Sequence, residues 1–132
     1  MSARSKARKA ALDVLFSADL RSGPCRPEEL DLMDREHRAY TDTLLAGVKE
    51  HLGQIDTFIH TYADGWDKDR LPAVDRNILR IAIFEILWGG VEHPVAISEA
   101  VSLAERLSTT QSAKFVNGLL ARISALAETL PR

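Results

Sequence analysis

The residues that most often do chemistry in proteins are thinly spread along this chain. None of the short signatures of phosphate-binding loops, nucleophile elbows or zinc peptidases occurs in it. The histidines lie too far apart for the spacing of metal ligands, at positions His37, His51, His60 and His93. The single Cys25 stands in a proline-rich stretch, with only Arg26 beside it to activate the thiol. We therefore expect no catalytic residue, no cofactor and no bound metal.

The side chains best suited to bind a ligand are the basic ones at the N-terminus. Residues 1–9 carry no acid and hold Arg4, Lys6, Arg8 and Lys9, in a chain whose net charge is −2. At the start of a helix such cations oppose the helix dipole, at a cost of about 0.3–1 kcal/mol for a badly placed charge. A phosphate backbone would neutralise them, which favours a nucleic acid as partner. The alternative is that a basic N-terminal arm serves solubility alone.

Aromatic side chains accompany these basic positions. Phe16 follows Arg8 and Lys9 by about two helical turns, where it could stack on a base. The same apolar residue would equally suit the protein core. Lys114 beside Phe115 repeats the pairing of a cation with an aromatic ring near the C-terminus.

Apolar residues recur at helical spacing along almost the whole sequence, so we expect an all-α fold. Gly, Pro and Asp residues divide the pattern into about seven helices that form a compact bundle. Their approximate bounds are 2–21, 27–33, 34–53, 55–62, 74–88, 94–107 and 112–130. The length of 132 residues suits one domain and is too short for two. A break near Gly65 divides the domain 1–132 into an N-terminal subdomain, 1–64, and a C-terminal subdomain, 65–132.

The segment from Val74 to Trp88 is apolar around most of its helical surface, which predicts a helix buried in the middle of the domain. Arg76 and Arg80 mark its one polar edge. They could face a nucleic acid or pair with carboxylates of the same or a neighbouring helix.

No run of about 18 apolar residues is present, and the N-terminus lacks the apolar region of a secretory signal. With one cysteine, no internal disulfide can form. These features predict a cytoplasmic protein without a membrane partner.

Four stretches of the chain resemble the NusB transcription antitermination family. Residues 69–85, DRLPAVDRNILRIAIFE, are similar to the central signature of that family, and residues 95–105, VAISEAVSLAE, to its next helix. Residues 114–120, KFVNGLL, are similar to its FVNG motif, and residues 7–16, ARKAALDVLF, to its arginine-rich first helix. The motifs occur in order and at the expected spacing over nearly the whole chain.

The resemblance implies an all-helical adaptor of two packed subdomains without catalytic activity. NusB proteins bind the boxA element of ribosomal RNA transcripts, as single-stranded RNA, together with NusE, a small-subunit ribosomal protein. The pair joins an RNA polymerase antitermination complex that supports processive elongation. Some relatives form homodimers that hide the RNA surface, so the resemblance leaves both a monomer and a homodimer open for this chain.

The residues that the resemblance assigns to RNA binding come from four parts of the chain. They are Arg4, Lys6, Arg8, Lys9, Phe16, Asp75, Arg76, Lys114 and Phe115. Gln111 departs from the family, because many relatives carry Asp there. Phe16 replaces a frequent Tyr, which keeps the stacking surface and removes the hydroxyl.

Two other functions compete with this interpretation. In a protein-only helical adaptor, the basic head (residues 1–9) would be disordered. The acidic body, residues 10–69 with a net charge of −7, would bind basic partners. NusB-like domains also precede RNA cytosine methyltransferases, but those enzymes need a nucleotide-binding domain with a catalytic Cys, and none is found in these 132 residues.

Overall fold

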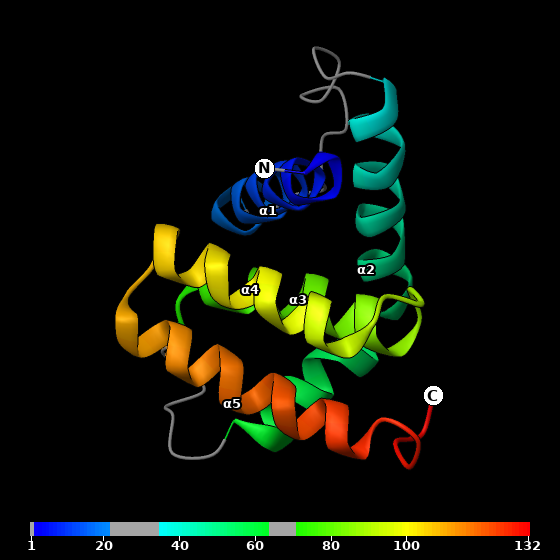
Figure 1. Cartoon of the computed structure of the whole chain (residues 1–132), viewed down its shortest axis with the longest axis vertical. Helices are drawn as coiled ribbons and strands as arrows, with labels where there is room; N and C mark the ends of the chain where they lie inside the picture. The colour runs from blue at the N-terminus through cyan, green and yellow to red at the C-terminus, as the bar shows by residue number, and fades with distance from the viewer. Residues whose placement is uncertain (1, 22–34, 64–70) are drawn as a thin grey trace.

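The fold is a bundle of α-helices, and the computed structural model describes it for residues 2–21, 35–63 and 71–132 (Figure 1). Within these ranges there are five helices and no strand. The helices are α1 (Ala3–Arg21), α2 (Arg35–Tyr62), α3 (Ala73–Leu87), α4 (His93–Leu107) and α5 (Thr110–Leu126). The predicted all-α bundle is confirmed, whereas the predicted helix at 27–33 lies outside the described residues.

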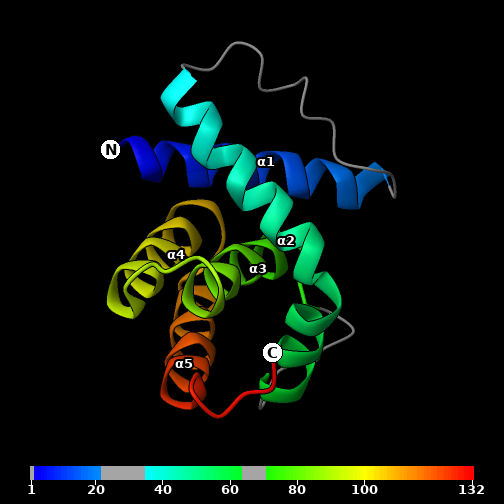
Figure 2. The same cartoon turned by 90° about the vertical axis from the view of Figure 1, so that its right-hand side faces the viewer.

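The helices form two groups that share α3 as their centre. Helix α1 lies across one end of the molecule, and α2 crosses it and runs on along one side (Figure 2). Helices α4 and α5 lie side by side at the other end, and α3 runs between the two groups (Figures 1 and 2). The chain's C-terminal end returns to α2, where Gln54 Nε2 donates to the carbonyl oxygen of Pro131 at 3.3 Å.

The predicted central position of α3 is confirmed by its burial. Every residue from Asn77 to Leu87 is buried except Arg80, so the helix is covered almost all round. Such a helix gains its stability from apolar surface removed from water on several faces. Most of the largest fully buried side chains belong to α3 and to its neighbours in α1, α2 and α5: Leu12, Leu44, Ile55, Ile78, Leu79, Ile83, Leu120 and Ile123.

One predicted boundary was wrong. The sequence predicted separate helices at 34–53 and 55–62, divided at Gly53, but α2 runs without a break from Arg35 to Tyr62. An exposed glycine inside a helix costs only about 1 kcal/mol relative to alanine. Buried side chains on both sides of Gly53, including Val48 and Ile55, stabilise the continuous helix by more than that.

Two other glycines have a defined role in the packing. A Cβ atom at Gly47 would overlap the ring of Phe84, so the glycine lets α2 approach α3 closely. Gly90 turns the chain from α3 into α4 with φ of 68°, a left-handed conformation that favours glycine.

A single buried cluster draws apolar side chains from all five helices. The two predicted subdomains, 1–64 and 65–132, stay a prediction. Across the described residues, no helix is both long and apolar enough to cross a lipid bilayer.

Candidate nucleic-acid interface

The predicted basic head forms the first turns of α1, and its four cations do not share one environment. Arg4 and Lys6 are exposed, and Lys9 is partly exposed. Lys9 Nζ donates to both carboxylate oxygens of Asp13, one turn further on, at 2.8 and 2.7 Å. Arg8, in contrast, is only 2% exposed.

Arg8 is held inside the protein by carboxylates of two other helices. Its Nε lies 3.0 Å from both Oε1 and Oε2 of Glu85, and its Nη2 lies 2.9 Å from Oε2. Its Nη1 lies 3.5 Å from Oε1 of Glu99 in α4. Burial alone would lower the pKa of Arg8, but the hydrogen bonds and charge of Glu85 more than offset this and raise it. In this conformation Arg8 fastens α1 to α3 and does not reach a phosphate.

Tyr40 of α2 completes this internal network. Its hydroxyl donates to Oε2 of Glu85, and its ring lies under the guanidinium of Arg4, 4.4 Å from the ring centroid. Burial, and then the hydrogen bond to Glu85, raises the pKa of Tyr40 to about 12. Ser5 Oγ donates to Glu99 at 2.7 Å, so the first turns of α1 contact three other helices. The network fixes the start of α1, from which Arg4 and Lys6 are exposed to solvent.

Arg76 and Arg80 both contact carboxylates. The sequence left open whether these arginines face a nucleic acid or pair with carboxylates, and Arg80 pairs with carboxylates. Arg80 Nε and Nη2 donate to Asp56 at 2.9 Å each, and its Nη1 lies 3.3 Å from Asp19 Oδ2. Arg76 Nη1 lies 3.4 Å from the same Asp19 oxygen. Asn77 Nδ2 also donates to Asp19, at 2.9 Å. Arg76 keeps 35% of its side chain exposed, against 11% for Arg80, so only Arg76 offers a cation to solvent.

Asp75 lies inside the protein, not on the surface that the resemblance implied. It is 0% exposed and accepts a hydrogen bond from Ser112 Oγ at 2.7 Å. Thr109, the residue before α5, accepts a hydrogen bond from Ser112 N at 2.9 Å and so caps the helix. Asp75 therefore positions the start of α5 against the start of α3, where it has no access to an RNA in this conformation.

The remaining predicted positions are accessible. Phe16 and Phe115 are partly buried, and Lys114 is exposed. The hydrogen bonds of Asn77 with Asp19 and of Asp75 with Ser112 place the end of α1 and the starts of α3 and α5 at one side of the molecule.

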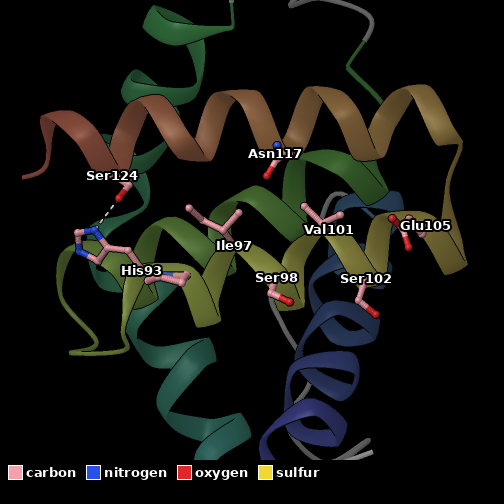
Figure 3. A pocket seen from close by; sticks show the side chains of 9 residues that line it. His93, Ile97, Ser98, Val101, Ser102, Glu105, Asn117 and Ser124 are labelled. Atoms are coloured by element: carbon pink, nitrogen blue, oxygen red, sulfur yellow. Dashed lines mark hydrogen bonds between the residues drawn. The ribbon is translucent and has the colours of Figure 1, made fainter.

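A second surface feature is the groove between α4 and α5, with a volume of about 560 Å³ (Figure 3). Ile97 and Val101 point into it from α4 and Asn117 faces them from α5 (Figure 3). At one end, Nδ1 of His93 lies 2.7 Å from Oγ of Ser124. Val95 of the same helix is 44% exposed, so apolar surface continues beyond the groove.

Comparison with known proteins identifies the family. Residues 5–125 match the model of the NusB family. The chain belongs to the NusB family. It is 48% identical to the transcription antitermination protein NusB of Salinispora arenicola (strain CNS-205), over 96% of this chain and 98% of that protein.

Two solved NusB structures have the same fold. T. maritima NusB superposes with a TM-score of 0.84 at 34% identity, covering 92% of this chain and 90% of that one. A chain from a crystal structure of the antitermination factors NusB and NusE in complex with dsRNA superposes with a TM-score of 0.81 at 28% identity. That match covers 95% of this chain and 98% of the other. The resemblance seen in the sequence is thereby confirmed.

Sequence reasoning missed Tyr40, Glu85 and Glu99 as parts of the basic end of this NusB protein. One signal was present, because Arg8 precedes Ala11 and Leu12 by three and four residues and so lies on the apolar stripe of its helix. A charged residue on a buried stripe requires an opposite charge inside the protein. Among the described residues, no group of three or more His, Cys, Asp or Glu side chains is arranged to hold a metal ion.

Proposed function

We propose that this NusB protein is a non-catalytic adaptor of transcription antitermination that binds boxA-type single-stranded RNA of ribosomal RNA transcripts together with NusE. Its place of action is the cytoplasm, in the RNA polymerase antitermination complex. Family membership supports the antitermination role, and the fold shared with a chain from a NusB–NusE complex with dsRNA supports both classes of partner.

The observation that carries the RNA-binding part is the set of cations at the start of α1. Arg4 and Lys6 reach solvent from a helix that Arg8 fixes to Glu85 in the interior. Cations on a helix with a fixed backbone lose less conformational entropy on binding than cations on a flexible arm. This rigid arrangement supports a phosphate-binding role over a role in solubility alone.

The proposed RNA surface consists of the accessible members of the predicted set. They are Arg4, Lys6, Lys9, Phe16, Arg76, Lys114 and Phe115. Cations in this set bind phosphates, and the two phenylalanine rings offer faces on which unpaired bases stack. Arg8 and Asp75 act as positioning residues, because both are buried and bonded to other helices.

The groove between α4 and α5 is the surface that we assign to NusE. Its apolar walls, formed by Ile97 and Val101, and the exposed Val95 nearby suit a protein partner better than a phosphate backbone. Simultaneous binding to RNA and NusE raises the effective concentration of each partner for the other. Two individually weak contacts then give one tight complex.

The double substitution Arg4→Ala with Lys6→Ala tests the RNA surface. We expect the dissociation constant for a boxA-type RNA to rise about tenfold or more, because two phosphate contacts are lost. Fluorescence anisotropy with a labelled RNA measures this, with and without NusE.

Lys49→Ala is the matched control, because Lys49 is an exposed cation on α2. The control leaves affinity within about twofold, and circular dichroism shows both variants folded. Equal affinities of the double variant and the wild type would contradict the proposed surface and favour the protein-only adaptor.

A further inference from the structure

The groove between α4 and α5 carries two rows of side chains that indicate which kind of protein segment it binds. Ile97 and Val101, one turn apart on α4, form a half-buried apolar row (Figure 3). Ser98, Ser102 and Glu105 form a second row along the same helix, and all three are exposed. An apolar row beside a polar row matches a partner segment that is itself apolar on one face and polar on the next.

The two walls of the groove favour a helix as the bound segment. An extended segment gains backbone hydrogen bonds at the free edge of a sheet, but both walls here are helices, whose backbone groups are paired within each helix. The short side chains of Ser98, Ser102 and Ser124 let the backbone of a third helix come close. From His93 to Glu105 the lining covers about 18 Å of α4, which is the length of about three helical turns.

The charge of the groove lies at one end. Glu105 is an exposed acid, and the lining contains no Lys or Arg. Within the described ranges, no hydrogen bond or ion pair engages the Glu105 carboxylate. At the other end of the groove, Nδ1 of His93 lies 2.7 Å from Oγ of Ser124. An acid without a cation beside it repels a phosphate backbone and attracts a basic side chain of a protein.

NusE has the chemistry that this acid requires. A ribosomal protein also binds the phosphates of ribosomal RNA, and it does so through Lys and Arg side chains on its surface. A cation of this kind can pair with Glu105 while apolar side chains of the same segment pack on Ile97 and Val101. The charge and the apolar row therefore favour the same class of partner.

We infer that an amphipathic helix of NusE binds along this groove, with a Lys or Arg of that helix paired with Glu105. The inference rests on the proposed function and extends it by naming the kind of segment and the residue that selects it. The apolar row supplies most of the affinity, because it loses contact with water on binding. Glu105 sets the direction of the bound helix, because only one end of the groove carries this charge.

Charge reversal at Glu105 tests the charged contact. We expect Glu105→Lys to raise the dissociation constant for purified NusE about tenfold, and Glu105→Gln to raise it about threefold, in the absence of RNA. Surface plasmon resonance with immobilised NusE measures both, and the differences shrink as salt is added, because salt screens exposed charges. Glu50→Lys is the matched control, because Glu50 is 76% exposed on α2, and it leaves the affinity for NusE within about twofold.

Ser102→Leu tests the close approach of a helix without weakening the fold, because Ser102 is exposed. We expect it to raise the dissociation constant for NusE about tenfold or more, since the larger side chain fills the groove. Its affinity for boxA-type RNA alone stays within about twofold of the wild type. Ala46→Leu, at an exposed position of α2, is the control and leaves both affinities within about twofold.

Each other outcome overturns the inference in a distinguishable way. If Ser102→Leu weakens NusE binding while Glu105→Lys binds like the wild type, the groove still binds NusE but the charged contact is wrong. If both variants bind NusE like the wild type, the groove is not the NusE surface, and the RNA surface on α1 stands. If Ser102→Leu instead converts a dimer of the free protein into a monomer, the groove holds a second copy of this chain.

Discussion

The pair of Arg8 and Glu85 stabilises the contact of α1 with α3 only while both charges are present. The two side chains are 3% and 1% exposed, so neither charge can turn to water when its partner is removed. A buried charge without a partner costs several kcal/mol, whereas an apolar pair of similar volume is often as stable as the ion pair.

We therefore expect Arg8→Ala to lower the free energy of unfolding by about 3–5 kcal/mol. Arg8→Met combined with Glu85→Leu is expected to recover most of that loss, as measured by urea denaturation. If the double variant is folded, its RNA affinity decides the role of Arg8. Unchanged affinity supports a positioning role, and a large loss would show that Arg8 leaves the interior to contact RNA.

The ionisation of Tyr40 at high pH tests the buried network of Arg8, Glu85 and Tyr40. Burial and the hydrogen bond to Glu85 raise its pKa from the ordinary value of 10.0 to about 12. Its contribution to stability is therefore fully present below pH 10.0 and is lost as the pH rises towards about 12. A spectrophotometric titration of tyrosinate absorbance will show a component near this higher pKa, and Tyr40→Phe will remove it. A wild-type titration without that component would contradict the hydrogen bond.

At the scale of elements, hydrophobic periodicity predicted which segments are helical and that the segment 74–88 is central. Periodicity could not predict that α2 is continuous. A glycine such as Gly53 can end a helix, but it can also lie inside an exposed helix at a cost of only about 1 kcal/mol. Tertiary packing of the residues on either side decides whether the helix continues.

The basic head of the candidate site was predicted from local sequence alone. The partners of Arg8 and Asp75 were not, because they come from residues far away in the chain, Glu85 and Ser112.

Gly47 and Gly53 both lie within α2, and their substitution distinguishes the effect of packing on stability from the effect of helix propensity. Gly47→Ala is expected to lower the free energy of unfolding by about 1–3 kcal/mol, because the new methyl overlaps the ring of Phe84. Gly53→Ala is expected to raise it by up to about 1 kcal/mol, because nothing opposes the methyl. Thermal denaturation of the two variants measures both. A stabilised Gly47→Ala would show that α2 and α3 pack less closely than described.

At the scale of the whole molecule, the buried cluster holds two surfaces of different chemistry in a fixed relation. The accessible cations of α1 lie near its start, which contacts α4 through the hydrogen bond of Ser5 with Glu99, whereas the apolar groove lies between α4 and α5. An adaptor can use two such surfaces together, because each bound partner raises the effective concentration of the other. A homodimer that covers α1 would compete with RNA, so the mass of the free protein in solution should be measured beside every binding assay.

The most direct test of the central claim is the salt dependence of boxA-type RNA binding in the presence of NusE. Each phosphate contact contributes about 0.7 to the slope of log K against log salt for a single strand. The wild type is expected to show a steep fall, and Arg4→Ala with Lys6→Ala a slope smaller by roughly 1.4. A flat response of the wild type, or equal slopes for the two proteins, would contradict an RNA surface built on the cations of α1.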